Sequence, residues 1–146
     1  MELQRIKLQM IKENTPIFTL DPILSADNIV ELINAREKYD LSPTSKIIVV
    51  GLDNKNKINI YTEIATGATD FVNFKMSELF KPILLSNSNK FILIHNNPSG
   101  DSTPSKNDKE IAKKLKDISE LMGITFLDFI IIGENNYKSV IKEEVK

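Results

Sequence analysis

The stretch "HNNPSGDSTPSKND", His95 to Asp108, concentrates residues whose side chains could bind a metal ion. His95 is the only histidine of the chain and there is no cysteine, so a transition-metal site would need carboxylates, amides or water to complete it. Alternate residues of an extended chain point the same way, so positions 95 and 97 can face one ligand. Only twelve residues separate His95, at a predicted strand end, from Asp108, at a predicted helix start. The loop is therefore a candidate metal site.

The same residues also have purely structural explanations. Ser105 and Asp108 precede an apolar-periodic run with the spacing of a capping box, in which they would be the N-cap and N3 residues. "NPSGDSTPS" is rich in ordinary turn formers. His95 could be hydrogen-bonded at a strand end without any metal. Capping and metal binding are compatible, so both interpretations stay open.

Periodicity and turn residues predict strands and helices in alternation around this loop. Strands are expected at residues 4–13, in a hairpin over 45–64 with the turn "DNKNK", and at 90–95, 124–133 and 137–141. Helices are expected after Ser25 as N-cap, within 73–88, and over 105–123 with Gly123 as the stop. Pro82 lies inside the second of these and predicts a kink or a late start. Intermixed strands and helices favour an α/β sandwich with a mixed sheet.

Two helices have a clear apolar face. The faces are expected to consist of Ile29, Val30, Leu32 and Ile33 in the first helix, and of Ile111, Leu115, Ile118 and Met122 in the third. Lys106, Lys109, Lys113 and Lys116 recur on the other side of the third helix. A lysine stripe could contact phosphates, but acidic residues share the helix, so a solvated face is the favoured interpretation.

The composition is that of an ordinary soluble domain. The 146 residues are expected to form a single domain, residues 1–146, with 41% apolar and 27% charged residues. A net charge of −1 predicts no bulk attraction to nucleic acid or to anionic membranes. The chain has no apolar run long enough to span a bilayer and no secretory h-region at its start. The absence of cysteine fits a cytoplasmic location.

Four segments together resemble a known family. They are "HNNPSGDSTPSKND", "LKDISELMGITFLDFIIIG", "EIATGA" and "LSADNIVELI". The first two are similar to the RadC-like branch of the JAB/MPN metalloprotease fold, whose motif reads His-Asn-His-Pro-Ser-Gly-Asp, then Pro-Ser-x-x-Asp, a helix, and Leu-Asp-His-Ile-Ile-Ile-Gly. The resemblance implies a JAB/MPN-like (cytidine-deaminase-like) sandwich, with a mixed β-sheet flanked by helices.

The resemblance also implies a zinc hydrolase site. His95, position 97 and Asp108 would be the zinc ligands, Glu63 the general base and Ser105 a group that holds the oxyanion. A catalytic zinc with three protein ligands lowers the pKa of its bound water to about 7. A nearby carboxylate then takes the proton as this water attacks a peptide or isopeptide carbonyl.

This chain departs from the family pattern at one of the three expected zinc-ligand positions. Position 97 is Asn, and an amide oxygen is a poor zinc ligand beside an imidazole nitrogen. Phe129 and Ala68 also replace a family His and Thr. The expected function is therefore a metallopeptidase scaffold in which zinc binding is weak or absent and activity is impaired or lost.

Two alternatives are kept. One is an active metal-dependent hydrolase in which Asn97, Asp101 or a water fills the gap. The other is a non-catalytic interaction module, of phage or mobile-element origin or associated with DNA repair, the family's customary label. The expected partner is a peptide or protein substrate, nucleic acid is the less favoured partner, and no membrane is expected. An exposed edge at "YKSVI" or at the first strand could pair with a second copy to form a homodimer.

Overall fold

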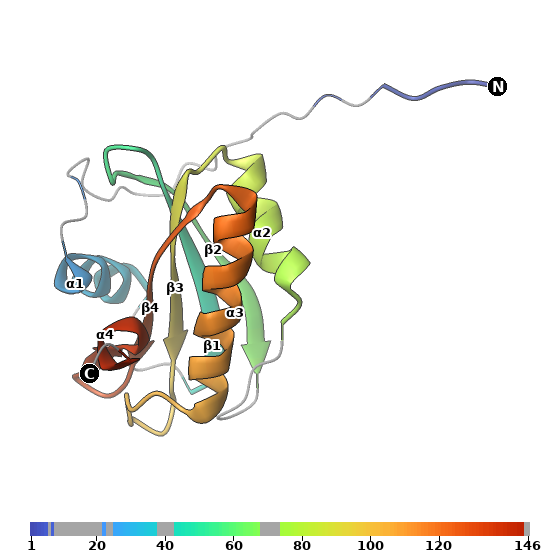
Figure 1. Cartoon of the computed structure of the whole chain (residues 1–146). Coiled ribbons are helices and arrows are strands. Elements are labelled where there is room, and N and C mark those ends of the chain that lie inside the picture. Colours follow the sequence, from blue (N-terminus) through green and yellow to red (C-terminus); the bar gives the residue numbers. More distant parts are fainter. Residues whose placement is uncertain (6, 8–21, 23–24, 38–42, 68–73, 145–146) are drawn as a thin grey trace.

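The computed structural model describes residues 1–5, 7, 22, 25–37, 43–67 and 74–144 of the chain (Figure 1). In order, the elements are α1 (Ala26–Glu37), β1 (Ser45–Leu52), β2 (Ile58–Gly67), α2 (Met76–Leu85), β3 (Lys90–Asn96), α3 (Lys106–Met122), β4 (Thr125–Ile132), β5 (Tyr137–Ser139) and α4 (Val140–Glu144). None of the helices in these ranges has the length and apolar content needed to cross a membrane.

The described strands form a mixed sheet in the order β2-β1-β3-β4-β5. Only β3 and β4 pair in parallel, because α3 carries the chain back across the sheet between them, whereas the other neighbours are antiparallel. Two hydrophobic clusters cover the two faces of the sheet. The predicted α/β sandwich with a mixed sheet is confirmed.

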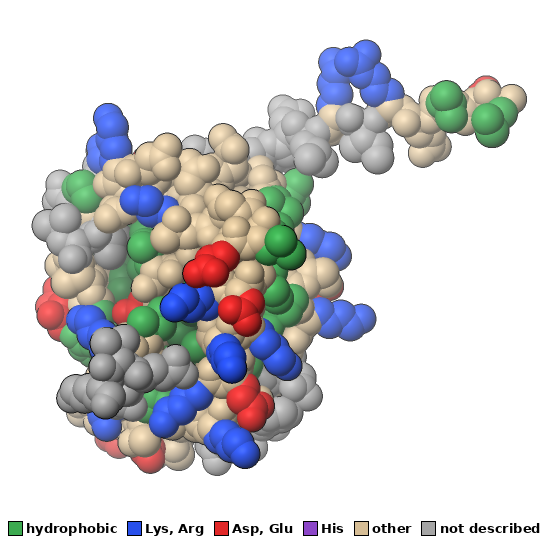
Figure 2. Space-filling model, in the orientation of Figure 1, with side chains coloured by type: hydrophobic (Ala, Val, Ile, Leu, Met, Phe, Trp, Pro, Cys, Tyr) green, Lys and Arg blue, Asp and Glu red, His purple; other side chains and the backbone are tan. Residues whose placement is uncertain are grey.

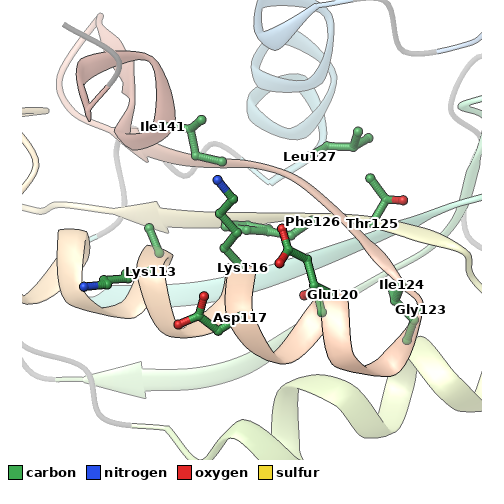
Figure 3. A pocket seen from close by; sticks show the side chains of 12 residues that line it. Lys113, Lys116, Asp117, Glu120, Gly123, Ile124, Thr125, Phe126, Leu127 and Ile141 are labelled. Atoms are coloured by element: carbon green, nitrogen blue, oxygen red, sulfur yellow. The ribbon is translucent and has the colours of Figure 1, made fainter.

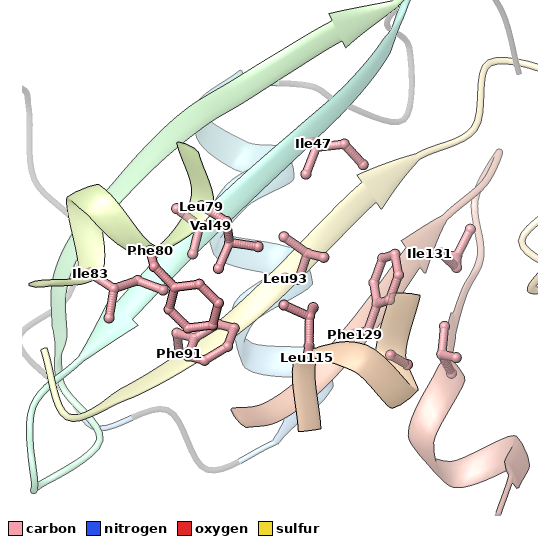
Figure 4. Close-up of a cluster of buried hydrophobic side chains, with 12 residues drawn as sticks. Ile47, Val49, Leu79, Phe80, Ile83, Phe91, Leu93, Leu115, Phe129 and Ile131 are labelled. Carbon is pink, nitrogen blue, oxygen red and sulfur yellow. The ribbon is translucent and has the colours of Figure 1, made fainter. Parts of the chain in front are cut away.

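The face that carries α2, α3 and α4 holds the larger aromatic cluster (Figure 4). Phe91, Leu93 and Phe129 come from the sheet, and Leu115 comes from α3. Because side chains alternate along a strand, the residue that continues this face beyond Leu93 is His95. The fold therefore places the end of β3 directly beneath the start of α3.

The opposite face of the sheet packs against α1. Ile29 and Ile33 are fully buried there against Ile48 and Ile94, as the apolar periodicity predicts. The Ser25 hydroxyl accepts a hydrogen bond from the Asn28 N–H at 3.4 Å, so the predicted N-cap is confirmed.

Two local predictions need correction, and one lies outside the described residues. Pro82 sits inside α2 and not in its first turn, so the late-start alternative is wrong. Residues 140 and 141 were expected to continue the last strand, but the strand ends at Ser139. The Ser139 hydroxyl accepts the Lys142 N–H at 3.2 Å, and α4 begins at the next residue. The strand expected at 4–13 falls mostly on residues that the structure does not describe.

The four lysines of the expected stripe are exposed along α3. Figure 2 shows lysine and arginine side chains interspersed with acidic ones over this side of the molecule. Such mixing fits a solvated helix face and gives no field of a single sign.

Candidate functional site

His95 is buried where β3 meets α3. It pairs with Ile47 of β1 and Ile131 of β4, and the residue is 7% exposed. Its neighbour Asn96 points to the other face, where its amide accepts from the Lys46 N–H at 2.6 Å and donates to the Thr44 carbonyl at 2.9 Å. Asn96 thus ties β3 to the start of β1, and its role is structural.

The N-terminus of α3 is closed by the predicted capping box. The Asp108 N–H donates to the Ser105 hydroxyl at 3.1 Å, and the Ser105 N–H donates to the Asp108 Oδ2 at 2.8 Å. Capping uses only one carboxylate oxygen. The other, Oδ1, lies 3.4 Å from His95 Nδ1, with both side chains less than a tenth exposed. One carboxylate therefore serves the cap and faces the histidine.

The loop between β3 and α3 holds Asn97 in a defined orientation. The Asn97 N–H donates to the Ile132 carbonyl at 2.7 Å, and its carbonyl accepts the Gly100 N–H at 3.0 Å. Its side-chain Nδ2 donates to the Asp101 carbonyl at 3.0 Å. Because Nδ2 is committed to an acceptor, the amide oxygen must point away from Asp101, and that oxygen is buried without a hydrogen-bond partner.

Three buried side-chain atoms at the end of β3 and in the loop that follows it lack hydrogen-bond partners within the described residues. They are both ring nitrogens of His95 and Asn97 Oδ1. Buried polar atoms without partners each cost about 1–3 kcal/mol, and most native structures contain few of them. His95 Nδ1 lies 3.4 Å from Asp108 Oδ1, and the imidazole, the carboxylate and the Asn97 amide oxygen are groups that can bind a cation.

This donor set differs from that of a catalytic zinc site with three His, Cys, Asp or Glu ligands. No group of three or more His, Cys, Asp or Glu side chains that could hold a metal occurs among the residues described. His95 and Asp108 supply one nitrogen and one carboxylate, and the remaining donor is a neutral amide oxygen. Such a set suits a loosely held divalent ion better than tightly bound zinc, which prefers nitrogen and sulfur ligands.

Glu63 lies away from this group. Its Cα pairs with Ile48, whose side chain packs on the α1 face, whereas His95 belongs to the α3 face. Glu63 forms an ion pair with Lys46 at 3.4 Å and accepts a hydrogen bond from the Thr66 hydroxyl. The register of β1 and β2 shifts at this point, and a shift of one residue decides which face a strand side chain occupies. The structure thus brings His95, Ser105 and Asp108 together with the Asn97 loop, but not Glu63.

A further residue supports the loop. An ideal Cβ on Gly133 would lie 2.4 Å from the Gly100 carbonyl oxygen and 2.9 Å from the Ser102 backbone nitrogen. The adjacent Glu134 N–H donates to the same Gly100 carbonyl at 3.0 Å. In the sequence, Gly133 is the last residue of the expected strand 124–133 and of the family motif, and neither feature indicated that it supports the loop.

The carboxyl of Asp108 titrates below its usual range. Burial raises its pKa, but the nearby His95 ring and the hydrogen bonds with Ser105 lower it, and the net result is a lowered pKa. The folded-state pKa therefore lies below the unfolded value of about 3.9, and the stability that this carboxylate contributes is present above that value. It is lost as the pH falls through the folded pKa.

We expect the free energy of unfolding to fall between about pH 5 and pH 2, and to fall less steeply in Asp108→Asn. Asparagine keeps an oxygen acceptor for the Ser105 N–H, so the helix start is retained. Urea unfolding at a series of pH values measures both slopes. Asp101 has a lowered pKa as well, mainly because of its hydrogen bonds with Thr103, so Asp101→Asn serves as the exposed control. Equal slopes in Asp108→Asn and the unmodified protein would contradict the assignment.

Comparison with known proteins agrees with the fold and with the motif. The family model described as RadC-like JAB domain matches residues 23–145. A UPF0758 protein of Desulfitobacterium hafniense is 40% identical over 92 residues, which cover 63% of this chain and 40% of the relative. UPF0758 proteins of Staphylococcus haemolyticus and Carboxydothermus hydrogenoformans are 36% and 30% identical, over 83% and 99% of this chain and 52% and 61% of their own length. The chain thus spans about half the length of the curated relatives it matches. It belongs to the RadC-like JAB domain family.

Proposed function

We propose that this chain is a RadC-like JAB domain on a zinc metallopeptidase scaffold whose hold on zinc, and hence its hydrolase activity, is impaired. The observation that carries the proposal is the Asn97 side chain. Its amide oxygen is buried and unpartnered, two residues after His95 in the chain and at the position where the family motif has a second histidine.

The remaining parts of the scaffold support a degenerate version of that site. Asp108 is anchored by the helix cap, and its lowered pKa keeps it ionised at neutral pH. His95 is buried, and neither of its ring nitrogens makes a hydrogen bond within the described residues. An imidazole that binds a metal ion needs one ring nitrogen free for that ion. A bound zinc would act as a Lewis acid and would lower the pKa of a coordinated water. An imidazole, a carboxylate and an amide leave such an ion weakly held.

The position of Glu63 supports the same proposal. A general base must come within hydrogen-bond reach of the proton that it removes. Glu63 is paired with Lys46 at the outer strand of the sheet, on the opposite face from His95.

The Ser105 hydroxyl accepts the helix-capping hydrogen bond and keeps its own proton free to donate toward a developing negative charge.

The test is a direct measurement of metal binding and hydrolysis. The purified protein is analysed for bound metal, then titrated calorimetrically with zinc, manganese or magnesium, and assayed on peptide and isopeptide substrates with each ion. We expect substoichiometric zinc on purification and no cleavage with any of the ions. Stoichiometric, tightly held zinc with cleavage that Glu63→Gln abolishes would reject the proposal. Cleavage with manganese or magnesium alone would replace it with an active hydrolase that uses a substitute ligand.

A further inference from the structure

A hollow lies along α3, toward the opposite end of the helix from Asp108. Its volume is about 1020 Å³, and it is open between α3, the first half of β4 and α4 (Figure 3). We call it the α3/β4 groove, and among the residues that line it are Lys116, Ser119, Glu120, Phe126, Leu127 and Ile141. The groove reaches along α3 from Ala112 to Gly123, and neither His95, Asn97 nor Asp108 lines it.

Two small residues of α3 line the hollow. Ala112 and Ser119 are 3% and 1% exposed and lie two turns apart on the side of the helix that faces the sheet.

The floor of the groove contains a polar atom without a partner. Ser119 Oγ is buried and makes no hydrogen bond within the described part of the chain. A serine in a helix usually satisfies its hydroxyl on the preceding turn or in water, and an alanine here would avoid the cost of leaving it unpaired. A ligand with a hydrogen-bond acceptor would satisfy it once the side chains that cover the hydroxyl move aside.

One wall of the groove is an unpaired strand edge. β5 pairs only with Ile130–Ile132, so on the side away from β3 the Thr125–Leu127 segment of β4 has no strand partner among the described residues. Leu127 is 37% exposed. The free edge ends at Asp128, whose side chain accepts the Phe129 N–H at 2.8 Å and so blocks that donor.

The charged groups of the groove balance one another. Lys116 and Glu120 extend from α3 toward Leu127 and Ile141 (Figure 3), and neither forms an ion pair within the described residues. The groove therefore offers donors (the Lys116 ammonium and the Ser119 hydroxyl), an acceptor (the Glu120 carboxylate) and an apolar floor, without net charge. A peptide main chain has both donors and acceptors and no net charge, so it fits this lining better than an anion does.

We propose that the α3/β4 groove binds a short extended peptide segment with apolar side chains, which pairs as an added strand with Thr125–Leu127 and accepts a hydrogen bond from Ser119. Main-chain hydrogen bonds along the strand supply the affinity, and the apolar floor selects the side chains. The proposal does not depend on metal chemistry at His95, so the two are tested separately.

The probe is a capped, uncharged pentapeptide of alternating threonine and leucine, titrated to millimolar concentration into ¹⁵N-labelled full chain. We expect the amide resonances of residues 119–127 to shift, and those of residues 95–108 to stay unchanged. Leu127→Glu should weaken binding about fivefold or more, as removal of a central apolar contact does. Leu121→Glu is the matched control, because Leu121 is 89% exposed on α3 and does not line the groove.

Ser119→Ala separates a binding role from a structural one and does not depend on whether Leu127→Glu folds. We expect a higher midpoint of thermal unfolding together with at least about twofold weaker peptide binding. Stabilisation without any change in peptide binding would overturn the role of the hydroxyl. No shift with the peptide, shifts confined to residues outside the groove, or equal weakening by Leu127→Glu and Leu121→Glu would overturn the proposal. So would binding of octanoate, an apolar anion, in preference to the peptide.

Discussion

Replacing Asn97 with histidine is expected to raise the affinity of the domain for zinc about 100-fold or more. Loss of a partner that only supports a metal ligand typically costs about 10–100-fold, and a direct ligand should matter more. The present hydrogen bond from Asn97 Nδ2 to the Asp101 carbonyl also favours the gain. An imidazole N–H can donate to the same carbonyl, which orients the ring and leaves its other nitrogen for the metal.

Isothermal titration with zinc measures the gain, and hydrolysis of peptide and isopeptide substrates is followed in parallel. The matched control is Asn54→His, which adds a histidine at an exposed position in the β1–β2 turn, away from His95. A rise in affinity in both variants would mean that any surface histidine binds zinc. If Asn97→His leaves zinc affinity unchanged, Asn97 is not the position that weakens the site.

A gain in zinc affinity need not be accompanied by activity. Glu63 is paired with Lys46 and lies on the other face of the sheet from His95. If Asn97→His binds zinc tightly but does not cleave any substrate, the displaced base is the second defect. The weak metal binding and the missing catalysis then have separate causes, and each defect can be repaired without the other.

Gly133→Ala is expected to destabilise the protein by about 3 kcal/mol and to displace the loop that carries Asn97. The added Cβ would lie 2.4 Å from the Gly100 carbonyl oxygen and 2.9 Å from the Ser102 backbone nitrogen. Both contacts are with backbone, which cannot move aside as the end of a long side chain can. Urea unfolding measures the loss, and the backbone amide signals of residues 97–102 report the displacement.

Gly123→Ala is the control for a glycine needed for a different reason. Gly123 ends α3 at φ 73°, and a Cβ added there would have nothing within 4 Å, so the cost is conformational strain of about 1 kcal/mol. We expect this variant to leave signals of the Asn97 loop in place. In the Asn97→His background, Gly133→Ala should also reduce zinc affinity, whereas Gly123→Ala should not. Equal effects of the two substitutions on the loop would show that Gly133 has no special part in holding it.

Local features of the fold could be predicted because they depend on residues close together in the chain. The capping box of Ser105 and Asp108 and the left-handed stop at Gly123 each involve one turn of helix. The hairpin turn is also local, since Asp53 Oδ1 accepts the N–H groups of Lys55 and Lys57. The last strand was predicted two residues too long. The hydroxyl of Ser139 caps a helix at this point, and the apolar residues that follow do not by themselves indicate a helix.

By itself, the sequence determined the order of the elements from α1 to β5, the resemblance to the family and the residue type at each ligand position, because periodicity, turn chemistry and motif spacing are properties of neighbouring residues. Only the tertiary structure decided that one oxygen of Asp108 faces His95, that the Asn97 amide oxygen is left unpartnered, and that Gly133 supports their loop. It also decided that Glu63 lies on the other face of the sheet. These features depend on strand register and on close contacts between segments distant in the chain, and a shift of one residue in register reverses the side on which a strand residue lies.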